Sequence, residues 1–190
     1  MSNLFFGSTH PGTAPVLKVH QVGDGLPPRV DLLRQLYQCP EGGIRNARMR
    51  GYGLAITRAC HARDDMCELK AIFDFVTHRN PQTGITNIRY TGDIRGKDTF
   101  QSALRTMEFG GGDCDDHAQL NAVLAAVNGF KGKWRITSNT GASWDHIYYL
   151  AGVPKNRPFQ WIALDTTLGA GRFNKEPNRA KYQDFYVSEE

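Results

Sequence analysis

Apolar positions follow two helical patterns along this chain. One set of apolar residues after residue 54 has the spacing of a single helix face: Leu69, Ile72, Phe73 and Val76. Asn80-Pro81 is expected to end that helix. The segment Cys114–Asn128 is apolar on nearly every side, and Gly129 follows it as a natural stop. A helix of this kind belongs in the middle of a domain.

Strand-like patterns come mainly after the buried helix. Three runs, 133–138, 144–150 and 159–165, alternate or concentrate apolar residues in the manner of strands. Before the helix, residues 85–90 are a short strand candidate, and residues 101–107 are expected to form a further helix. One central helix followed by an antiparallel meander predicts an α+β fold, with the buried helix packed on an antiparallel sheet.

The first 50 residues have a different character, because Gly and Pro are frequent in them. Pro15–Val22 alternates like an edge strand, and Asp31–Tyr37 can make two helical turns before Cys39-Pro40 ends them. We predict an arm over residues 1–50 that wraps the core or reaches a neighbouring chain. A core over residues 51–169 and a C-terminal tail over residues 170–190 complete the predicted organisation.

Size and charge fit one domain without a membrane span. The chain has 190 residues and a formal net charge of +4, and no apolar run approaches the roughly 18 residues of a transmembrane helix. The start at Met1 lacks the pattern of a secretory signal, so we expect synthesis in the cytoplasm without a signal peptide. Arg45, Arg48 and Arg50 lie in a Gly-rich segment without aromatic residues. This pattern favours a solvated or partner-facing linker over a nucleic-acid surface.

The four cysteines contain no CxxC pair, which argues against a zinc ribbon. Cys60 and Cys67 are seven residues apart, and on one helix they would lie two turns apart on one face. That separation is too long for a disulfide within a helix, so we expect both to be small buried residues. Cys114 stands apart from the others because of the residues around it.

Cys114 is the candidate nucleophile. The run Gly110-Gly-Gly-Asp-Cys-Asp-Asp-His-Ala118 places it at the N-terminus of the buried helix. There, unpaired N–H groups and the positive end of the helix dipole favour the thiolate. The glycines let a substrate backbone approach the sulfur, and the backbone N–H of Cys114 can donate to an oxyanion.

Two later motifs supply a base and an acid that orients it: Trp144-Asp-His-Ile-Tyr-Tyr149 and Trp161-Ile-Ala-Leu-Asp-Thr-Thr167. A hairpin in which His146 directly opposes Asp165 would bring their Cβ atoms to about 5 Å. Leu150 would then face Trp161. The sequence therefore predicts a catalytic triad of Cys114, His146 and Asp165.

Alternatives remain for the residues around the nucleophile. His117 follows Cys114 by three residues and is a rival base, although a position on the helix surface or in support of the site is preferred. Asp113 suits an N-cap, and Asp115 and Asp116 suit a first helical turn. The same charges should raise the pKa of the cysteine, and the balance of these effects is open.

Gln101 lies upstream of the cysteine and is an oxyanion candidate; a capping or surface amide is the alternative. A metal site would have to be built from one helical turn: Asp113, Cys114, Asp116 and His117. These hard and soft ligands would crowd one another, so we expect no metal and no other cofactor.

These motifs resemble the transglutaminase-like superfamily, and more narrowly its small members in tailed bacteriophages and related bacterial sequences. The resemblance covers about residues 54–168 and is strongest over 100–168. It implies a papain-like α+β fold and a Cys-His-Asp triad, which falls on Cys114, His146 and Asp165. Papain-like enzymes carry an oxyanion glutamine upstream of the cysteine, as Gln101 lies here. Crosslinking members carry a tryptophan and apolar residues after the cysteine. Asp115-Asp116-His117 stands there in this chain and favours hydrolysis over crosslinking.

We therefore expect a thiol hydrolase, either a peptidase or amidase or an isopeptidase, that works through a covalent acyl-enzyme. The resemblance implies a virion component of the tail or baseplate. Its substrate would be cell-wall peptide or a virion protein, and its partners would be other tail proteins. The alternative is a non-enzymatic structural tail or baseplate protein on the same fold, with residues 1–50 and 170–190 making the contacts.

Overall fold

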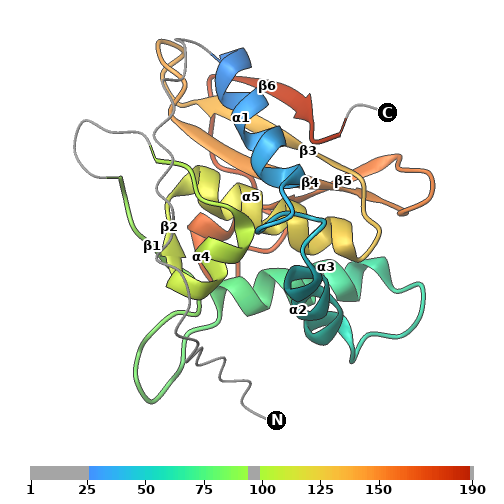
Figure 1. The fold of residues 1–190 in the computed structure, drawn as a ribbon. Helices are drawn as coiled ribbons and strands as arrows, with labels where there is room; N and C mark the ends of the chain where they lie inside the picture. Colours follow the sequence, from blue (N-terminus) through green and yellow to red (C-terminus); the bar gives the residue numbers. More distant parts are fainter. Residues whose placement is uncertain (1–25, 94–98, 189–190) are drawn as a thin grey trace.

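Five helices, a larger sheet of four strands and a smaller sheet of two make up the part of the chain that this computed structural model describes, residues 26–93 and 99–188 (Figure 1). The helices are α1 (Leu26–Gln38), α2 (Ala47–Thr57), α3 (Asp65–Thr77), α4 (Ala103–Phe109) and α5 (Cys114–Val127), with a short 3-10 turn η1 (Thr166–Leu168). The strands are β1 (Arg89–Tyr90), β2 (Gly111–Gly112), β3 (Gly132–Ser138), β4 (His146–Val153), β5 (Gln160–Leu164) and β6 (Lys181–Tyr186).

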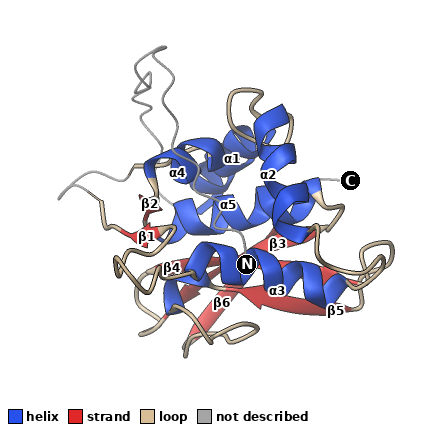
Figure 2. Ribbon diagram, turned by 90° about the horizontal axis from the view of Figure 1, so that it is seen from below, coloured by secondary structure: helices blue, strands red, loops and turns tan. Residues whose placement is uncertain are grey.

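The central helix is the predicted one. α5 lies in the middle of the molecule, with the large sheet along one side and α2, α3 and α4 against its other sides (Figures 1 and 2). Every residue from Asp115 to Ala125 is buried, including the polar ones. Trp134, Tyr149 and Ile162 on the inner face of the sheet belong to the same apolar core. Burial on all sides explains why the helix shows no polar face in its sequence.

The large sheet is antiparallel in the order β5-β4-β3-β6. Its first three strands correspond to the three predicted runs. The fourth, β6, comes from the predicted C-terminal tail and pairs with β3 from Lys133 opposite Tyr186 to Ser138 opposite Lys181. Together with α5, this sheet confirms the α+β fold class. A separate parallel pair, β1 and β2, places Arg89 opposite Gly111 and Tyr90 opposite Gly112.

The periodic segment before residue 78 is α3, as predicted. Its four apolar positions are fully buried: Leu69, Ile72, Phe73 and Val76. Asp64 caps the helix by accepting a hydrogen bond from the N–H of Cys67. The helix ends at Thr77, shortly before Asn80-Pro81.

Part of the predicted arm lies along the core. Residues 31–37 belong to α1, whose Val30, Leu33 and Tyr37 are buried. The Tyr37 ring meets the Trp134 ring edge-on, with centroids 6.4 Å apart. The edge strand predicted at Pro15–Val22 lies outside the described residues. α2 runs across Gly51, so a helix rather than a linker spans the predicted boundary.

The prediction for Cys60 and Cys67 is wrong. The two residues form a disulfide, with Cα atoms 5.7 Å apart, and both are half-buried. Seven residues of continuous helix would separate them by about 10.5 Å along its axis. The chain avoids that separation because α2 ends at Thr57 and α3 begins at Asp65, which leaves Cys60 in the connecting loop.

The predicted hairpin register is wrong by two residues. Leu150 faces Ala163, and Gly152 faces Trp161. Gly152 permits this register because a Cβ there would lie 2.7 Å from Cβ of Pro158 in the hairpin loop. A shift of two residues keeps each side chain on its predicted face. Tyr148, Leu150, Ala163 and Trp161 accordingly form one apolar cluster on the outer face of the sheet.

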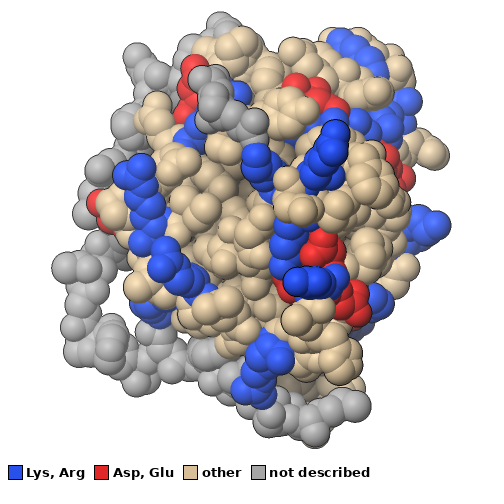
Figure 3. All heavy atoms as spheres, turned by 90° about the vertical axis from the view of Figure 1, so that its right-hand side faces the viewer, with Lys and Arg blue, Asp and Glu red and all other residues tan. Residues whose placement is uncertain are grey.

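No helix in the described part of the chain is both long and apolar enough to cross a membrane. The three arginines of the predicted linker are exposed, and Arg48 pairs with Glu108 and Tyr52. On the face shown in Figure 3, Lys and Arg side chains form separate groups with Asp and Glu among them. That face therefore carries no continuous basic surface.

Candidate active site

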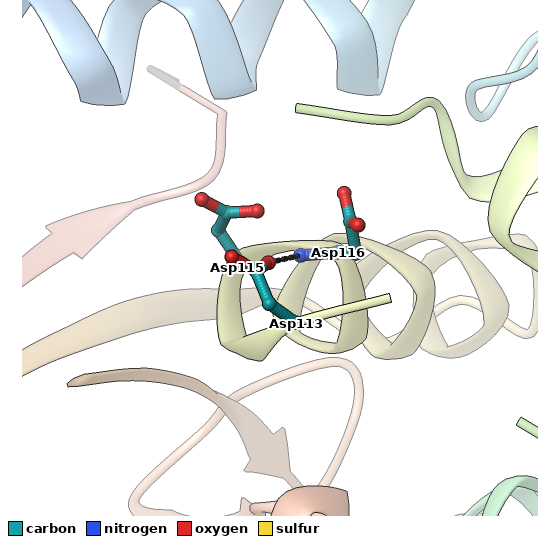
Figure 4. A group of neighbouring side chains, drawn as sticks. All are labelled: Asp113, Asp115 and Asp116. Atoms are coloured by element: carbon teal, nitrogen blue, oxygen red, sulfur yellow. Dashed lines mark hydrogen bonds between the residues drawn. The ribbon is translucent and has the colours of Figure 1, made fainter. Parts of the chain in front are cut away.

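Cys114 begins the central helix, as predicted. The preceding residue, Asp113, is the N-cap and accepts a hydrogen bond from the N–H of Asp116 at 3.5 Å (Figure 4). Gly112 is required for a reason other than substrate access. A Cβ at this position would lie 2.4 Å from the Cβ of Asp116, so only glycine leaves room for the Asp116 side chain here.

The residue after His146 on β4 acts on the thiol of Cys114. The backbone N–H of this residue, Ile147, and the N–H of Cys114 itself both lower the thiol pKa and so favour the thiolate. They are outweighed by burial of the thiol and by the charges of Asp115 and Asp113, which together raise the pKa of Cys114 to about 12. The balance that the sequence left open therefore favours the protonated thiol in this structure.

His146 and Asp165 make direct contact. The Nε2 atom of His146 lies 2.8 Å from Oδ2 of Asp165, whose side chain is fully buried. The other carboxylate oxygen, Oδ1, accepts from the N–H of Thr167 at 3.2 Å and from its hydroxyl at 2.6 Å. Because Nε2 faces the carboxylate, Nδ1 is the ring nitrogen of His146 left for proton exchange with a thiol.

This contact does not depend on the register from which it was predicted. β5 ends at Leu164, and Asp165 is the N-cap of η1 rather than a strand residue. The carboxylate therefore reaches His146 from the start of a turn, past the last paired position of the strand, Tyr149 opposite Leu164. The two side chains meet even though the strands pair two residues away from the predicted alignment.

His117 is not on the helix surface, contrary to one of the positions proposed for it. Its side chain is buried, and Nδ1 lies 2.8 Å from Oγ1 of Thr166. Burial lowers the pKa of His117, against the smaller raising effects of the Arg89 backbone and the Asp165 charge. A neutral, enclosed imidazole of this kind is poorly placed to act as the base for Cys114.

Gln101 is engaged elsewhere. Its side-chain amide donates to Oδ2 of Asp116 at 2.6 Å and to the carbonyl of Gly111 at 3.1 Å. Its backbone N–H donates to the other oxygen of Asp116 at 2.7 Å. Burial raises the pKa of Asp116 to about 6, against the lowering effect of these hydrogen bonds. With both amide hydrogens in use, Gln101 has none left for an oxyanion at Cys114.

Three carboxylates gather in the first turn of α5. One oxygen from each of Asp113, Asp115 and Asp116 lies within 4.8 Å of the others (Figure 4). Asp113 caps the helix and Asp116 binds Gln101, so two of the three have structural roles. We assign no ion to them.

Tyr90 is a residue of this region that the sequence did not single out. It lies opposite Gly112 in the β1–β2 pair, and its side chain is 59% exposed. Its ring centroid is 6.3 Å from that of His117. Burial of the phenol raises the Tyr90 pKa, and the negative charges that Cys114 and Asp113 carry when ionised add to that effect. Of the strand predicted at residues 85–90, only Arg89–Tyr90 is strand β1, and its pairing with the glycines before Cys114 was not predicted.

Comparisons with known proteins support the fold. No family model matches the chain, and no curated protein sequence matches it. Among solved structures, the chain is similar to a protein from Cytophaga hutchinsonii described as a "putative cysteine protease", with a TM-score of 0.50 and 18% identity. The match covers 82% of this chain and 45% of that protein, so this chain spans less than half its length. At this identity, the similarity shows a shared fold.

Proposed function

We propose that this chain is a thiol hydrolase of papain-like architecture that cleaves an amide or isopeptide bond. The observation that carries the proposal is the hydrogen bond of 2.8 Å between His146 and the buried Asp165, where the residue after His146, Ile147, has a backbone N–H that lowers the pKa of the Cys114 thiol. Nucleophile, base and orienting acid thus come from three separate elements. The fold shared with a protein described as a "putative cysteine protease" supports the same class of chemistry.

In this proposal, His146 acts as a general base during the attack. Because the resting thiol is protonated, its proton passes to Nδ1 of His146 as the sulfur bonds to the substrate carbonyl carbon. Asp165 stabilises the resulting imidazolium without taking its proton. The imidazolium then protonates the leaving amine as the C–N bond breaks, and a thioester remains on Cys114. Water, deprotonated by the same histidine, hydrolyses the thioester and releases a carboxylate and the free thiol.

Hydrolysis is proposed over transfer because of the residues after the nucleophile. Asp115, Asp116 and His117 are buried polar side chains of the helix, in place of the tryptophan and apolar residues of crosslinking relatives. We propose a peptide or protein substrate, cell-wall peptide or a virion protein among them, and a place in a virion tail or baseplate. Mass spectrometry of purified particles tests the location: absence of this chain from them contradicts it.

One observation favours the alternative of a structural protein without activity. The raised pKa of Cys114 leaves little thiolate at neutral pH, and a thiol that is never deprotonated cannot attack. The two functions differ in what they require of His146. A hydrolase needs it to take the thiol proton, whereas a structural protein does not.

A peptide-based electrophilic probe separates the two functions. The hydrolase proposal predicts a covalent adduct on Cys114 that is lost in His146→Ala, with the fold unchanged by circular dichroism. Cys39→Ser is the matched control, because Cys39 is the other free cysteine among the described residues and is also half-buried. Equal labelling of Cys114 with and without His146 would favour the structural alternative.

A further inference from the structure

One face of the central helix carries three chemically active side chains in register. Cys114, His117 and Asn121 are three and four residues apart, the spacing of a single helix face. His117 and Asn121 both bind the hydroxyl of Thr166, the residue after Asp165. The helix that begins at Cys114 therefore also holds, through hydrogen bonds to Thr166, the turn that begins at Asp165.

The direction of the hydrogen bonds in this group is inferred from Asn121. The side-chain amide of Asn121 donates to the carbonyl of Leu164 and to Oγ1 of Thr166, both at 3.0 Å. Because that hydroxyl accepts from Asn121, its own hydrogen is available for Nδ1 of His117, 2.8 Å away. An imidazole accepts at Nδ1 only when it is neutral there, and burial keeps His117 in that form.

All three members are enclosed: Asn121 is fully buried, His117 is 2% exposed and Thr166 is 4% exposed. Buried polar groups that lose a partner are costly, so the Thr166 hydroxyl is expected to keep its contacts with both side chains. The same turn holds Asp165 from its other side, through the bonds of Thr167 to Oδ1. The carboxylate is thus fixed by its own turn and, through Thr166, by α5.

We propose that Thr166, which is hydrogen-bonded to Asn121 and His117, is a positioning residue that fixes where Asp165 and His146 lie relative to Cys114. The inference rests on the proposed function, which names those three residues as the reacting group. Thr166 touches none of the reacting atoms, and it acts only through the carboxylate beside it. His117 then serves as the acceptor of the Thr166 hydroxyl, and not as a second base.

Thr166→Val tests the proposal, because valine keeps the shape of threonine and removes the hydroxyl. We expect kcat on a peptide substrate to fall about 10- to 100-fold with KM within about twofold, since a small misplacement of the base slows chemistry more than binding. Thr166→Ser retains the hydroxyl and should keep kcat within about threefold of the parent.

A matched control separates positioning from loss of stability. Thr57→Val removes another buried hydroxyl, one that donates to Asn128 beyond the far end of α5 at 2.9 Å. It should lower the melting temperature as Thr166→Val does, but leave kcat unchanged. Equal kcat in Thr166→Val and Thr57→Val, with equal melting temperatures, would overturn the positioning role.

A readout independent of hydrolysis keeps the inference testable if the chain proves inactive. In ¹⁵N-histidine spectra, Thr166→Val should shift the ring nitrogens of His146 as well as those of His117, whereas Thr57→Val should shift neither. Unshifted His146 resonances in Thr166→Val would refute the positioning role. Failure of the proposed function has a different signature: no probe adduct on Cys114 in the parent protein, with the His146 shift still present.

Discussion

Asp115 carries a negative charge that raises the pKa of the Cys114 thiol, and a single substitution can remove that charge. Asp115 is the first charge among the causes that raise the thiol pKa to about 12, after burial itself. Asp115→Asn removes that charge and preserves the shape of the side chain. Asp113 is less suitable, because it is also the N-cap of α5.

The expected change is modest and can be worked out. A neighbouring charge a few ångströms away shifts a pKa by about one unit or more, so we expect the Cys114 pKa to fall by about one unit. Below pH 10 this gives about ten times more thiolate. A less basic thiolate is also a weaker nucleophile, by about threefold per unit of pKa. The net prediction for Asp115→Asn is alkylation of Cys114 about three to four times faster at pH 8.

The assay is timed alkylation with iodoacetamide, read by peptide mass spectrometry at several pH values. Cys39 is the internal reference in the same sample, since Cys60 and Cys67 are joined and do not react. Asp74→Asn is the matched control, because its exposed carboxylate is not among the charges that act on the thiol. An unchanged or slower rate at Cys114 in Asp115→Asn, with Cys39 constant, would refute the electrostatic reasoning.

Three further predictions concern the acid of the site, the disulfide and the arm. Asp165→Asn should keep the melting temperature within a few degrees and lower kcat by about 10³- to 10⁴-fold, because an amide cannot stabilise the imidazolium; a kcat within tenfold of the parent contradicts the role of the acid. Cys67→Ser opens a loop closed over a separation of seven residues. By chain entropy it should lower the free energy of unfolding by about 2.5 kcal/mol in urea titrations without reductant, and by nothing once reductant is added. Deleting residues 1–50 removes α1 and its buried side chains, so it should reduce stability and Cys114 labelling together. Loss of association in size-exclusion chromatography after deletion of residues 1–25 alone would assign assembly to the arm.

Local patterns were sufficient for much of the architecture. The helix face of Leu69, Ile72 and Phe73 and the all-round apolar pattern of Cys114–Asn128 both depend on residues within a few turns of one another. Periodicity reports such neighbours directly. The placement of Cys114 at a helix start also follows locally, since the glycines and Asp113 immediately before it supply the turn and the cap.

Contacts between distant segments decided the remaining features. The sequence could not show that the side-chain amide of Gln101 donates to Asp116, or that Tyr90 pairs with Gly112. It could predict that His146 and Asp165 meet, but not that the acid comes from the start of η1. These facts depend on how strands and turns align across the molecule, and small differences in loop geometry set that alignment.

The protonation state of Cys114 shows the same division. From the sequence, Cys114 is a cysteine at a positive helix end, with three acidic neighbours and an undecided pKa. Only the fold determines how far the thiol is removed from water and how its acidic neighbours are oriented around it, and these two factors raise its pKa. The sequence by itself determined which residues are the candidates for reaction. The tertiary structure decided their protonation and their support, because both depend on burial and on distances between segments far apart in the chain.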